Sequence, residues 1–446
     1  MNDNKTSKNS IVAKFAVPIS FLILFFLAAN FTDCDLVTFW KRRSHLTDLV
    51  VDMIPPDFSY IQKILLPLFY TIQMSVTGTV LGIFFALVLS PFGAANLGFP
   101  AVIRRILRIV IQILRSFPAL ILALTATFLF GLGTFAGTFA ITLYTFAIMT
   151  KLTYEDASAA DVKAYQALRA MGVSKYVAYI HGILPEIIPG FLTNALYLLE
   201  TNVRHSSILG YVGAGGIGLL LNEKISWLEY DKVGTILLML FLTVCVIEYF
   251  SRYLAALIRK ERTIKKEQAR LLLLFLAALF LICTFTLSLP DFSRTSPQTL
   301  RNMFAGFLQP DWSFFFSAEK DGLGYLLLET VCIAFIGTVI GAIVSAPLAF
   351  LNTKRFVPAP VSFLFNLVIM VIRSVPFLVY GLIFIRVSGP GAFTGVLTLA
   401  VCSIGLLTKR FTEALDALDP RPYHALLAMG VRPLPAICHS VLPQLK

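Results

Sequence analysis

The chain has 446 residues, of which 57% are hydrophobic and only 14% are charged, and its formal net charge is +12. Soluble domains are about one quarter charged, so this composition excludes an ordinary soluble enzyme and indicates an integral membrane protein. The positive charge does not indicate nucleic-acid binding, because no soluble basic domain carries it and lysine and arginine collect in the cytoplasmic loops of membrane proteins.

The first half of the chain alternates apolar runs with short polar segments. The uncharged run Phe15–Phe31 predicts a retained membrane helix with a cytoplasmic N-terminus, and residues 32–62 predict an external segment. Further spans are predicted at Ile64–Leu89, Ile106–Phe130, Phe135–Thr150, Ile187–Leu199 and Val233–Tyr249. Small residues one turn apart, Gly78 and Gly82, predict that a neighbouring helix approaches Ile64–Leu89 closely.

A polar island at 151–185 interrupts this apolar pattern. The residues from Gln166 favour a helix, Gly172 suits its left-handed cap, and a second short helix is predicted to run to Leu184-Pro185. The segment therefore predicts a compact helix–turn–helix protrusion. An ordinary loop is the alternative, but the segment occurs twice in the chain, which favours a docking element.

Polar residues and a glycine-rich run follow at 200–218. The spacing Gly213-x-Gly215-x-x-Gly218 matches the dinucleotide fingerprint by letter, but that fingerprint needs a preceding strand, and here a predicted membrane helix precedes it. Irregular glycine-rich backbone at membrane depth is tolerated only where it is buried in protein or lines a cavity. We expect a broken helix beside a pathway, with tight helix packing and no ligand contact as the alternative.

The second half of the chain repeats the first at a constant offset. Arg373-Ser-Val-Pro376 matches Arg115-Ser-Phe-Pro118 at an offset of 258 residues (373 − 115), and Ala428-Met-Gly-Val431 matches Ala170-Met-Gly-Val173 at the same offset. The sequence therefore predicts a tandem duplication. Its parts are a first repeat at 1–253, a basic cytoplasmic linker at 254–270 and a second repeat at 271–446 with its own polar island at 409–443.

The offset also predicts topology. Basic residues at 104–108 and in the linker place both polar islands in the cytoplasm, so the two repeats are expected to be parallel, related by an axis along the membrane normal, and to enclose a central pathway. A second glycine-rich run would fall beyond Lys446. The second repeat is therefore expected to be truncated and to lack its last spans.

The two polar islands carry a family resemblance. Their spacing resembles the Glu-Ala-Ala-x3-Gly-x9-Ile-x-Leu-Pro loop of binding-protein-dependent ABC importers, which forms the coupling helix that sits in a cleft of the ATPase subunit. In this sequence Gln166 and His424 stand where the family usually has Glu, and Gly182 and Ser440 stand where it has Ile. The resemblance implies the ATPase-coupling residues Gln166, Ala167, Gly172, Leu184 and Pro185, and in the second island His424, Ala425, Gly430, Leu442 and Pro443.

Three further motifs carry a narrower family resemblance. Leu184-Pro-Glu-Ile-Ile-Pro189, Asn202-Val-Arg204 and the run Gly210–Gly218 together are similar to the permease subunit of phosphonate ABC importers, a family with phosphate and phosphite relatives. The resemblance covers nearly all of both repeats. It implies an all-α integral membrane permease fold of about ten transmembrane helices in the cell membrane, with two permease halves fused in one chain. The implied partners are two ABC ATPase subunits on the cytoplasmic side and an extracellular or periplasmic solute-binding protein.

Charged residues inside the predicted spans are candidates for a substrate path. Such charges are costly and usually face a partner or a water-filled cavity, and arginine offers planar bidentate donors to a phosphorus oxyanion. Alternatively, each arginine pairs with a carboxylate or reaches the membrane interface, and Glu200 could simply satisfy Arg204 at i, i+4. The candidate path residues are Arg115, Ser116, Glu200, Asn202, Arg204, Gly213, Gly215 and Gly216, with Arg373 and Ser374 in the second repeat.

Enzymatic motifs are absent from the sequence. It contains no P-loop, so ATP hydrolysis is expected in a separate subunit, and its six cysteines and five histidines show no metal-ligand spacing, so we expect no cofactor. We predict the permease of an ATP-driven importer for phosphonate or a related phosphorus oxyanion. The alternatives are an ABC permease for methionine or a quaternary amine, a secondary transporter driven by an ion gradient, and a non-functional remnant.

Overall fold

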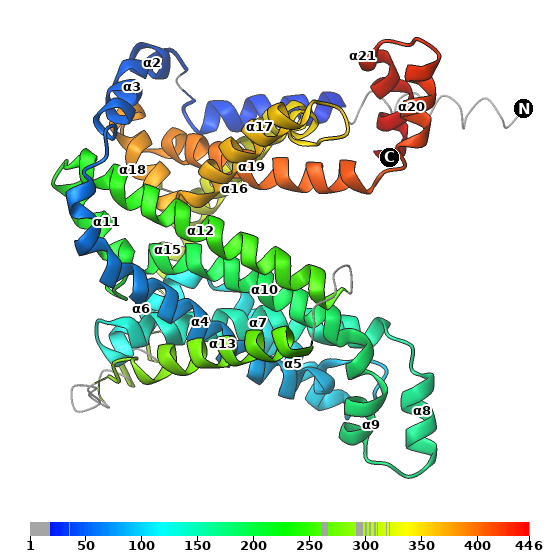
Figure 1. The fold of residues 1–446 in the computed structure, drawn as a ribbon. Helices are drawn as coiled ribbons and strands as arrows, with labels where there is room; N and C mark the ends of the chain where they lie inside the picture. The colour runs from blue at the N-terminus through cyan, green and yellow to red at the C-terminus, as the bar shows by residue number, and fades with distance from the viewer. Residues whose placement is uncertain are drawn as a thin grey trace, which may run out of the picture. The chain divides into compact units, whose positions relative to one another are not determined.

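The computed structural model describes residues 18–34, 36–259, 266–290 and 322–445, with residues 298, 301–302, 305–306, 309, 311–317 and 319–320 between the last two ranges. The start of the predicted span Phe15–Phe31 and the middle of the 254–270 linker lie outside the described residues. The described chain is helical and contains no strand (Figure 1). This confirms the all-α fold class.

Two compact units divide the chain. Unit 2 comprises residues 52–308, and unit 1 combines residues 1–51 with 309–446. The division into units therefore differs from the division into repeats, because each of the two leading apolar helices belongs to one repeat but to the other unit. The leading helix of the first repeat packs with the main helices of the second, and the leading helix of the second packs with those of the first. The repeats describe similarity along the sequence, whereas the units describe packing.

Unit 2 is built on two long helices, α4 and α7, that pack along one another. A Cβ atom added to Gly78 would lie 2.8 Å from the Ile141 Cβ, and one added to Gly82 would lie 2.7 Å from the Thr145 Cβ, so the predicted close approach of a neighbouring helix is confirmed. The helices of unit 2 are η1 (Phe58–Tyr60), α4 (Ile61–Gly93), α5 (Ala101–Ser116), α6 (Ala119–Phe130), α7 (Thr134–Ala159), α8 (Lys163–Ala170), α9 (Lys175–Gly182), α10 (Leu184–Leu209), η2 (Gly210–Val212), α11 (Ile217–Ser226), α12 (Tyr230–Ile258) and α13 (Lys266–Phe285).

Unit 1 repeats the same architecture with α16 and α19 at its centre. Gly337 and Gly341 of α16 allow the same close helix packing as Gly78 and Gly82 of α4. Cβ atoms added to them would lie 2.8 Å and 2.4 Å from the Cβ atoms of Leu399 and Ser403 in α19. The helices of unit 1 are Pro18–Phe31, α2 (Leu36–Lys41), α3 (Arg43–Asp52), α15 (Trp312–Phe316), α16 (Leu323–Asn352), α17 (Ala359–Ser374), α18 (Phe377–Ser388), α19 (Ala392–Ala417), α20 (Arg421–Ala428), α21 (Pro433–Ala436), η4 (Ile437–Val441) and η5 (Leu442–Leu445).

Helix bounds bear out the tandem duplication. Both ends of α17, α18, α19 and α20 lie 258 residues after the ends of α5, α6, α7 and α8 (for α17, 359 − 101). The caps agree as well, because Asp57 and Asp311 each accept a hydrogen bond of 3.0 Å from a backbone N–H two residues later, at Ser59 and Ser313.

The exchanged leading helices are held in different ways. In unit 2 the buried Gln73 amide donates to the Cys283 carbonyl (3.1 Å) and the Thr286 hydroxyl (2.8 Å), which fixes α13 on α4. In unit 1 the apolar helix Pro18–Phe31 packs Ala28 against Ile336 and neighbouring apolar side chains.

Five helices among the described residues are long and apolar enough to span a membrane, namely α4, α7, α12, α16 and α19. The predicted span Ile106–Phe130 is not one straight helix, because α5 and α6 meet at an angle of 93°. Pro118 removes a backbone donor and disfavours a helical residue before it, and Phe117 is accordingly extended (φ −83°, ψ 124°). The equivalent break before Pro376 bends α17 and α18 by 87°.

The prediction that polar residues interrupt a helix at 200 is wrong. Helix α10 runs without a break from Leu184 to Leu209, and the chain leaves it only at the glycine-rich run. Three of these polar residues are tolerated inside the helix because they have partners there: Glu200 pairs with Arg204, and Asn202 donates to two threonine hydroxyls.

Candidate functional site

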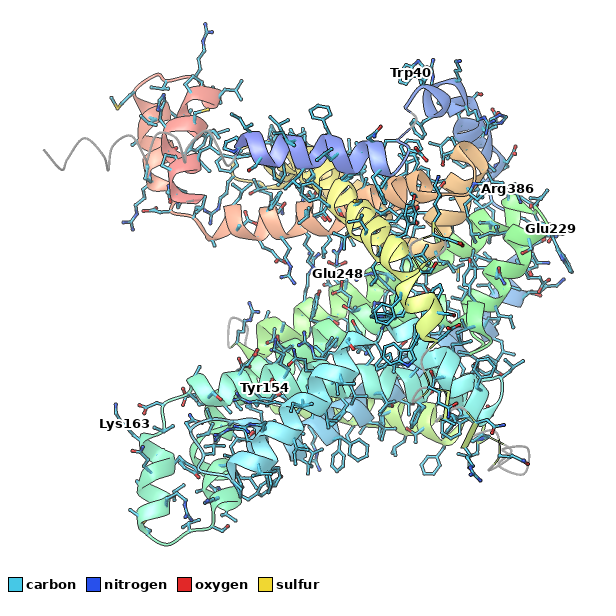
Figure 2. The ribbon with its side chains drawn as sticks, turned by 180° about the vertical axis from the view of Figure 1, so that it is seen from behind. Trp40, Tyr154, Lys163, Glu229, Glu248 and Arg386 are labelled. Carbon is cyan, nitrogen blue, oxygen red and sulfur yellow. The ribbon has the colours of Figure 1, made fainter. Side chains whose placement is uncertain are left out.

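The polar island at 151–185 forms a helical hairpin at one end of unit 2. Helix α7 continues to Ala159, α8 and α9 follow, and Gly172 between them adopts the left-handed conformation (φ +84°) that the sequence predicts. Met171, beside this glycine, leaves 70% of its side chain exposed. Lys163, at the start of α8, and Glu229 mark opposite ends of unit 2 in Figure 2.

The hairpin of unit 1, α20 and α21 with η4, repeats these features in detail. Gly430 has φ +82°, and Met429 is 77% exposed. The Asp161 N–H donates to Glu186 Oε1 (3.3 Å), and the equivalent Asp419 N–H donates to Gln444 Oε1 (3.2 Å). The two hairpins therefore present the same kind of tip, an exposed methionine beside a left-handed glycine.

Most of the predicted coupling residues lie on the surface of these hairpins. The exposed ones are Gln166, Ala167, Gly172, Pro185, His424, Ala425, Gly430, Leu442 and Pro443, whereas Leu184 is half-buried. Gly182 departs from the family isoleucine for a packing reason, because a Cβ there would lie 2.8 Å from the Tyr165 backbone nitrogen. Tyr165 itself is buried and donates its hydroxyl to the Leu97 carbonyl (2.6 Å), which ties α8 to the α4–α5 loop.

The glycine-rich run after α10 forms a break between two helices. Gly213, Gly215 and Gly216 have φ values of +84°, +77° and +74°, which residues with side chains rarely adopt. The Gly133 N–H donates to the Gly213 carbonyl (3.0 Å), and the Ile217 N–H donates to the Thr71 hydroxyl (2.8 Å). The run is therefore packed against α4 and the α6–α7 turn.

Asn202 lies in the interior of unit 2 as a polar junction between three helices. Its amide nitrogen donates to the Thr79 hydroxyl of α4 (2.8 Å) and to the Thr145 hydroxyl of α7 (2.7 Å), and its side chain is fully buried. One turn further along α10, Ser206 shares a hydrogen bond of 2.5 Å with Ser75 of α4. These bonds hold α10 against the α4–α7 pair.

Glu200 and Arg204 form an ion pair within α10. Their side chains are 6% and 16% exposed, so the pair is largely removed from water. Partnering of this kind removes most of the cost of a charge in an apolar environment.

Arg115 and Arg373 lie at the two helix breaks, each at the end of the helix before a proline. The neighbouring serines are engaged locally, since Ser116 donates to the Ile113 carbonyl (2.7 Å) and Ser374 to the Val371 carbonyl (2.8 Å). The Arg115 side chain is exposed. Arg373 is half-buried, and its side chain lies over Gly405, where an added Cβ would be 2.9 Å from the Arg373 Cγ.

Sequence reasoning missed three residues that interact with Arg115 or with one another across helices. Tyr144 of α7 interacts electrostatically with Arg115 and with Tyr197 of α10, and its ring centroid lies 5.0 Å from that of His205. We refer to Arg115, Tyr144, Tyr197 and His205 as the arginine–tyrosine cluster. No sequence spacing relates them, because they come from three helices that only the fold brings together. The cluster offers guanidinium and phenol donors, which suit an oxyanion.

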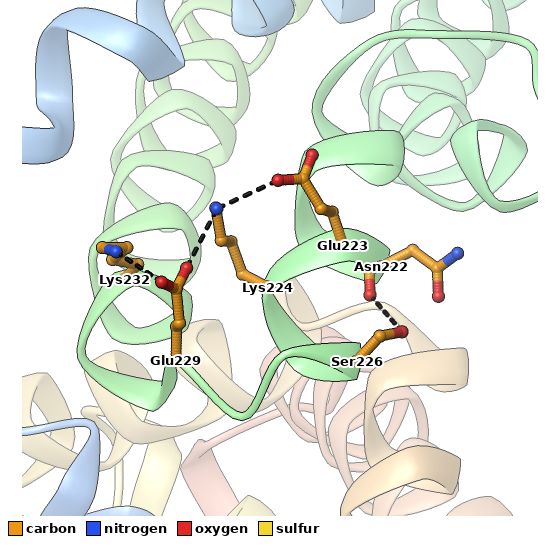
Figure 3. A network of polar contacts seen from close by, with 6 residues as sticks. All are labelled: Asn222, Glu223, Lys224, Ser226, Glu229 and Lys232. Carbon is orange, nitrogen blue, oxygen red and sulfur yellow. Dashed lines mark hydrogen bonds and ion pairs between the residues drawn. The ribbon is translucent and has the colours of Figure 1, made fainter.

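The opposite end of unit 2 carries a network of charged residues between α11 and α12 (Figure 3). The buried Lys224 amine lies 3.0 Å from Glu223 and 2.9 Å from Glu229, and Lys232 lies 2.7 Å from Glu229. The hydrogen bonds from Lys232 and Lys224 hold the pKa of Glu229 below its usual range, and those from Glu229 and Glu223 raise the pKa of Lys224. The network joins the two helices at the glycine-rich end of the unit.

Lowering the pH is expected to weaken this network. Because the pKa of Glu229 is depressed in the folded state, its contribution is present above the ordinary value of 4.5 and is lost as the pH falls through the lower folded value. The melting temperature of the purified chain should therefore decrease as the pH is lowered from about 5 to about 3. The decrease should be smaller for Glu229→Gln than for the wild type. Glu319→Gln, a matched change outside the network, should leave the profile unchanged, and equal profiles for wild type and Glu229→Gln would contradict the assignment.

Comparisons with known proteins find similar sequences among transport permeases. A family model for the binding-protein-dependent transport system inner membrane component matches residues 78–262. The phosphate-import permease protein PhnE of Mycolicibacterium smegmatis is 26% identical over 408 residues, which cover 90% of this chain and 76% of that protein. The phosphite transport system permease protein PtxC of Stutzerimonas stutzeri is 31% identical over 49% of this chain and 79% of its own length.

A second relative from that organism and one solved structure extend the comparison. The putative phosphite transport system permease protein HtxC of Stutzerimonas stutzeri is 31% identical over 54% of this chain and 86% of its own length. An inward-facing structure of the MetNI methionine ABC transporter aligns with 45% of this chain at 21% identity and a TM-score of 0.41. From the family match and these relatives, the chain belongs to the binding-protein-dependent transport system inner membrane components, the multi-pass membrane permeases of ABC importers.

Proposed function

We propose that the chain is the permease of an importer that carries phosphonate, or a related phosphorus oxyanion, from a solute-binding protein into the cytoplasm. The relatives named for phosphate and phosphite transport support this substrate class. In this proposal two ATPase subunits hydrolyse ATP, and the solute-binding protein sets most of the substrate choice.

The paired hairpins carry the proposal. One end of each unit carries a short helix followed by an exposed methionine and a left-handed glycine. The two methionines, Met171 and Met429, are 258 residues apart in the sequence (429 − 171). A solvent-exposed methionine has no role in the core of its own unit, and its flexible, polarisable side chain suits a partner's groove. Two equivalent tips fit two equivalent ATPase subunits.

The arginine–tyrosine cluster supports an anionic substrate. Arg115 is exposed at a helix break, and the hydroxyls of Tyr144 and Tyr197 lie on neighbouring helices. Guanidinium donors bind phosphoryl oxygens strongly because both partners are charged. We assign Arg115, and Arg373 at the equivalent break, to the substrate path, whereas Asn202 and the Glu200–Arg204 pair support the helices beside it.

The double change Met171→Asp, Met429→Asp is expected to reduce capture of the ATPase subunit about ten-fold or more, since each tip would place a charge in an apolar groove. The measurement is co-purification of the ATPase with the tagged permease from membranes that contain both. The matched control, Met171→Leu with Met429→Leu, should retain capture. Undiminished capture by the aspartate variant would contradict docking through these tips.

A further inference from the structure

Helix α5 divides its surface into distinct faces. At 3.6 residues per turn, Arg104, Arg105 and Arg108 fall within an arc of about 100°. The opposite side carries the exposed apolar residues Val102, Ile103, Ile106, Ile109, Val110 and Ile113, whose side chains are 44% to 68% exposed. Between these two faces, the buried Ile111 faces the interior of unit 2. A helix with a basic face and an exposed apolar face is typical of a membrane–water boundary.

The arginines are only partly used by the protein. Arg108 Nε donates to the Gly93 carbonyl (3.0 Å), and the Arg108 guanidinium carbon lies 5.0 Å from the centroid of the Tyr154 ring. Arg104 donates to the Ala95 carbonyl (3.4 Å), so each of these two arginines uses one N–H group at or just after the end of α4. A guanidinium has five such groups. Arg105 is exposed.

The start of α5 lies on the same side of unit 2 as the coupling hairpin. Lys175 of α9 donates to the Gly98 carbonyl in the loop before α5, and Tyr165 of α8 binds the same loop at Leu97. If the hairpin is cytoplasmic, as the proposed function requires, the three arginines face the cytoplasmic leaflet. That leaflet carries the anionic phospholipids in many cells.

The equivalent helix of unit 1 provides a contrast. Helix α17 occupies the same place before the same bend, but Ser362, Phe363 and Asn366 stand at the positions of the three arginines. Its surface also exposes apolar residues, such as Leu364 and Leu367. An apolar face is therefore common to both helices, whereas the basic face belongs to α5 alone.

We propose that the first two turns of α5 bind the phosphate headgroups of anionic phospholipids through Arg104, Arg105 and Arg108, while Val102, Ile103 and Ile106 contact the acyl chains. The adjoining exposed apolar face favours a lipid over a free phosphate or the transported oxyanion, because a soluble anion would leave that face uncovered. The site is asymmetric, since only one of the two repeats carries it.

Native mass spectrometry of the purified full chain, titrated with phosphatidylglycerol or phosphatidylcholine, tests the proposal. We expect a preference for phosphatidylglycerol in the wild type. The variant Arg104→Ser, Arg105→Phe, Arg108→Asn carries the residues of α17 and should lose that preference, at about five-fold per arginine removed. The matched variant Lys41→Ser, Arg42→Phe, Arg43→Asn loses the same charge elsewhere and should keep it.

A single-residue variant and a competition experiment separate loss of lipid binding from misfolding and from binding of a free anion. Arg105→Phe alone spares the bonds to α4, so it should melt at the wild-type temperature and still lose about five-fold in phosphatidylglycerol affinity. Inorganic phosphate in excess should not displace the lipid, and displacement would assign the site to a free anion. Equal lipid binding by wild type and both α5 variants would overturn the proposal. This assay needs no ATPase or transported substrate, so its failure would leave the proposed transport function standing.

Discussion

Replacing Arg115 by alanine is expected to lower the affinity for phosphonate uptake by about ten-fold or more, because a hydrogen bond to a charged group contributes about 1.5–3 kcal/mol. Arg115 is exposed at the α5–α6 break and interacts with Tyr144, so its loss removes a donor from the arginine–tyrosine cluster without opening the core. Arg373→Ala at the equivalent break should act in the same direction. The measurement is concentration-dependent uptake of labelled phosphonate by cells that express the complete importer.

The controls separate charge from geometry. Arg115→Lys keeps the charge but not the planar pair of donors, so it should recover only part of the affinity. Arg42→Ala removes an exposed arginine outside the proposed path and outside both hairpins, and it should transport normally. Methionine in excess should not compete with phosphonate. Wild-type affinity in both Arg115→Ala and Arg373→Ala would remove these arginines from the substrate path.

Replacing Gly218 by alanine is expected to prevent stable folding of unit 2. The added Cβ would lie 2.0 Å from the Ser207 carbonyl oxygen and 3.2 Å from the Gly210 Cα, so two backbone segments would have to separate. Overpacking typically costs about 1–3 kcal/mol and occasionally more, and here the obstacle is backbone that cannot rotate away. The measurement is the yield of monodisperse protein and its melting temperature.

A glycine elsewhere in unit 2 provides the matched control. An added Cβ at Gly190, near the start of α10, would meet only the Asp156 carboxylate at 3.9 Å. Gly190→Ala should therefore fold with a wild-type melting temperature. Equal melting temperatures for Gly218→Ala and Gly190→Ala would contradict the argument that the close crossing of α10 and α11 requires a glycine at position 218.

The hairpins illustrate how much a repeated local pattern can predict. Gly172 was predicted to end a helix in the left-handed conformation, and it does so, as does Gly430 in the repeated motif, because this requirement depends only on the residues next to the glycine. The duplication was equally visible in the sequence, since an offset compares residues with residues. Pro118 marks where the helix must break, because proline removes a backbone donor, but the angle of 93° between α5 and α6 depends on packing.

The candidate site was less predictable. Arg204 was visible as an intramembrane charge, and its partner at i, i+4 could be named from helix geometry alone. Tyr144 and His205, by contrast, look like ordinary residues of apolar helices until α7 and α10 are placed side by side. A contact between helices that are distant in sequence leaves no periodic signal in either one.

The sequence by itself therefore determined the membrane class, the family, the tandem repeat and the position of both hairpins, because composition, spacing and local turn chemistry are properties of neighbouring residues. The tertiary structure decided which unit each leading helix joins, that Asn202 is a junction between α4, α7 and α10, and that the Tyr144 ring lies 5.0 Å from that of His205. It also showed that α5 presents its basic and apolar faces to the surroundings. These features depend on which helix faces cover one another, and that choice is made by packing over the whole unit.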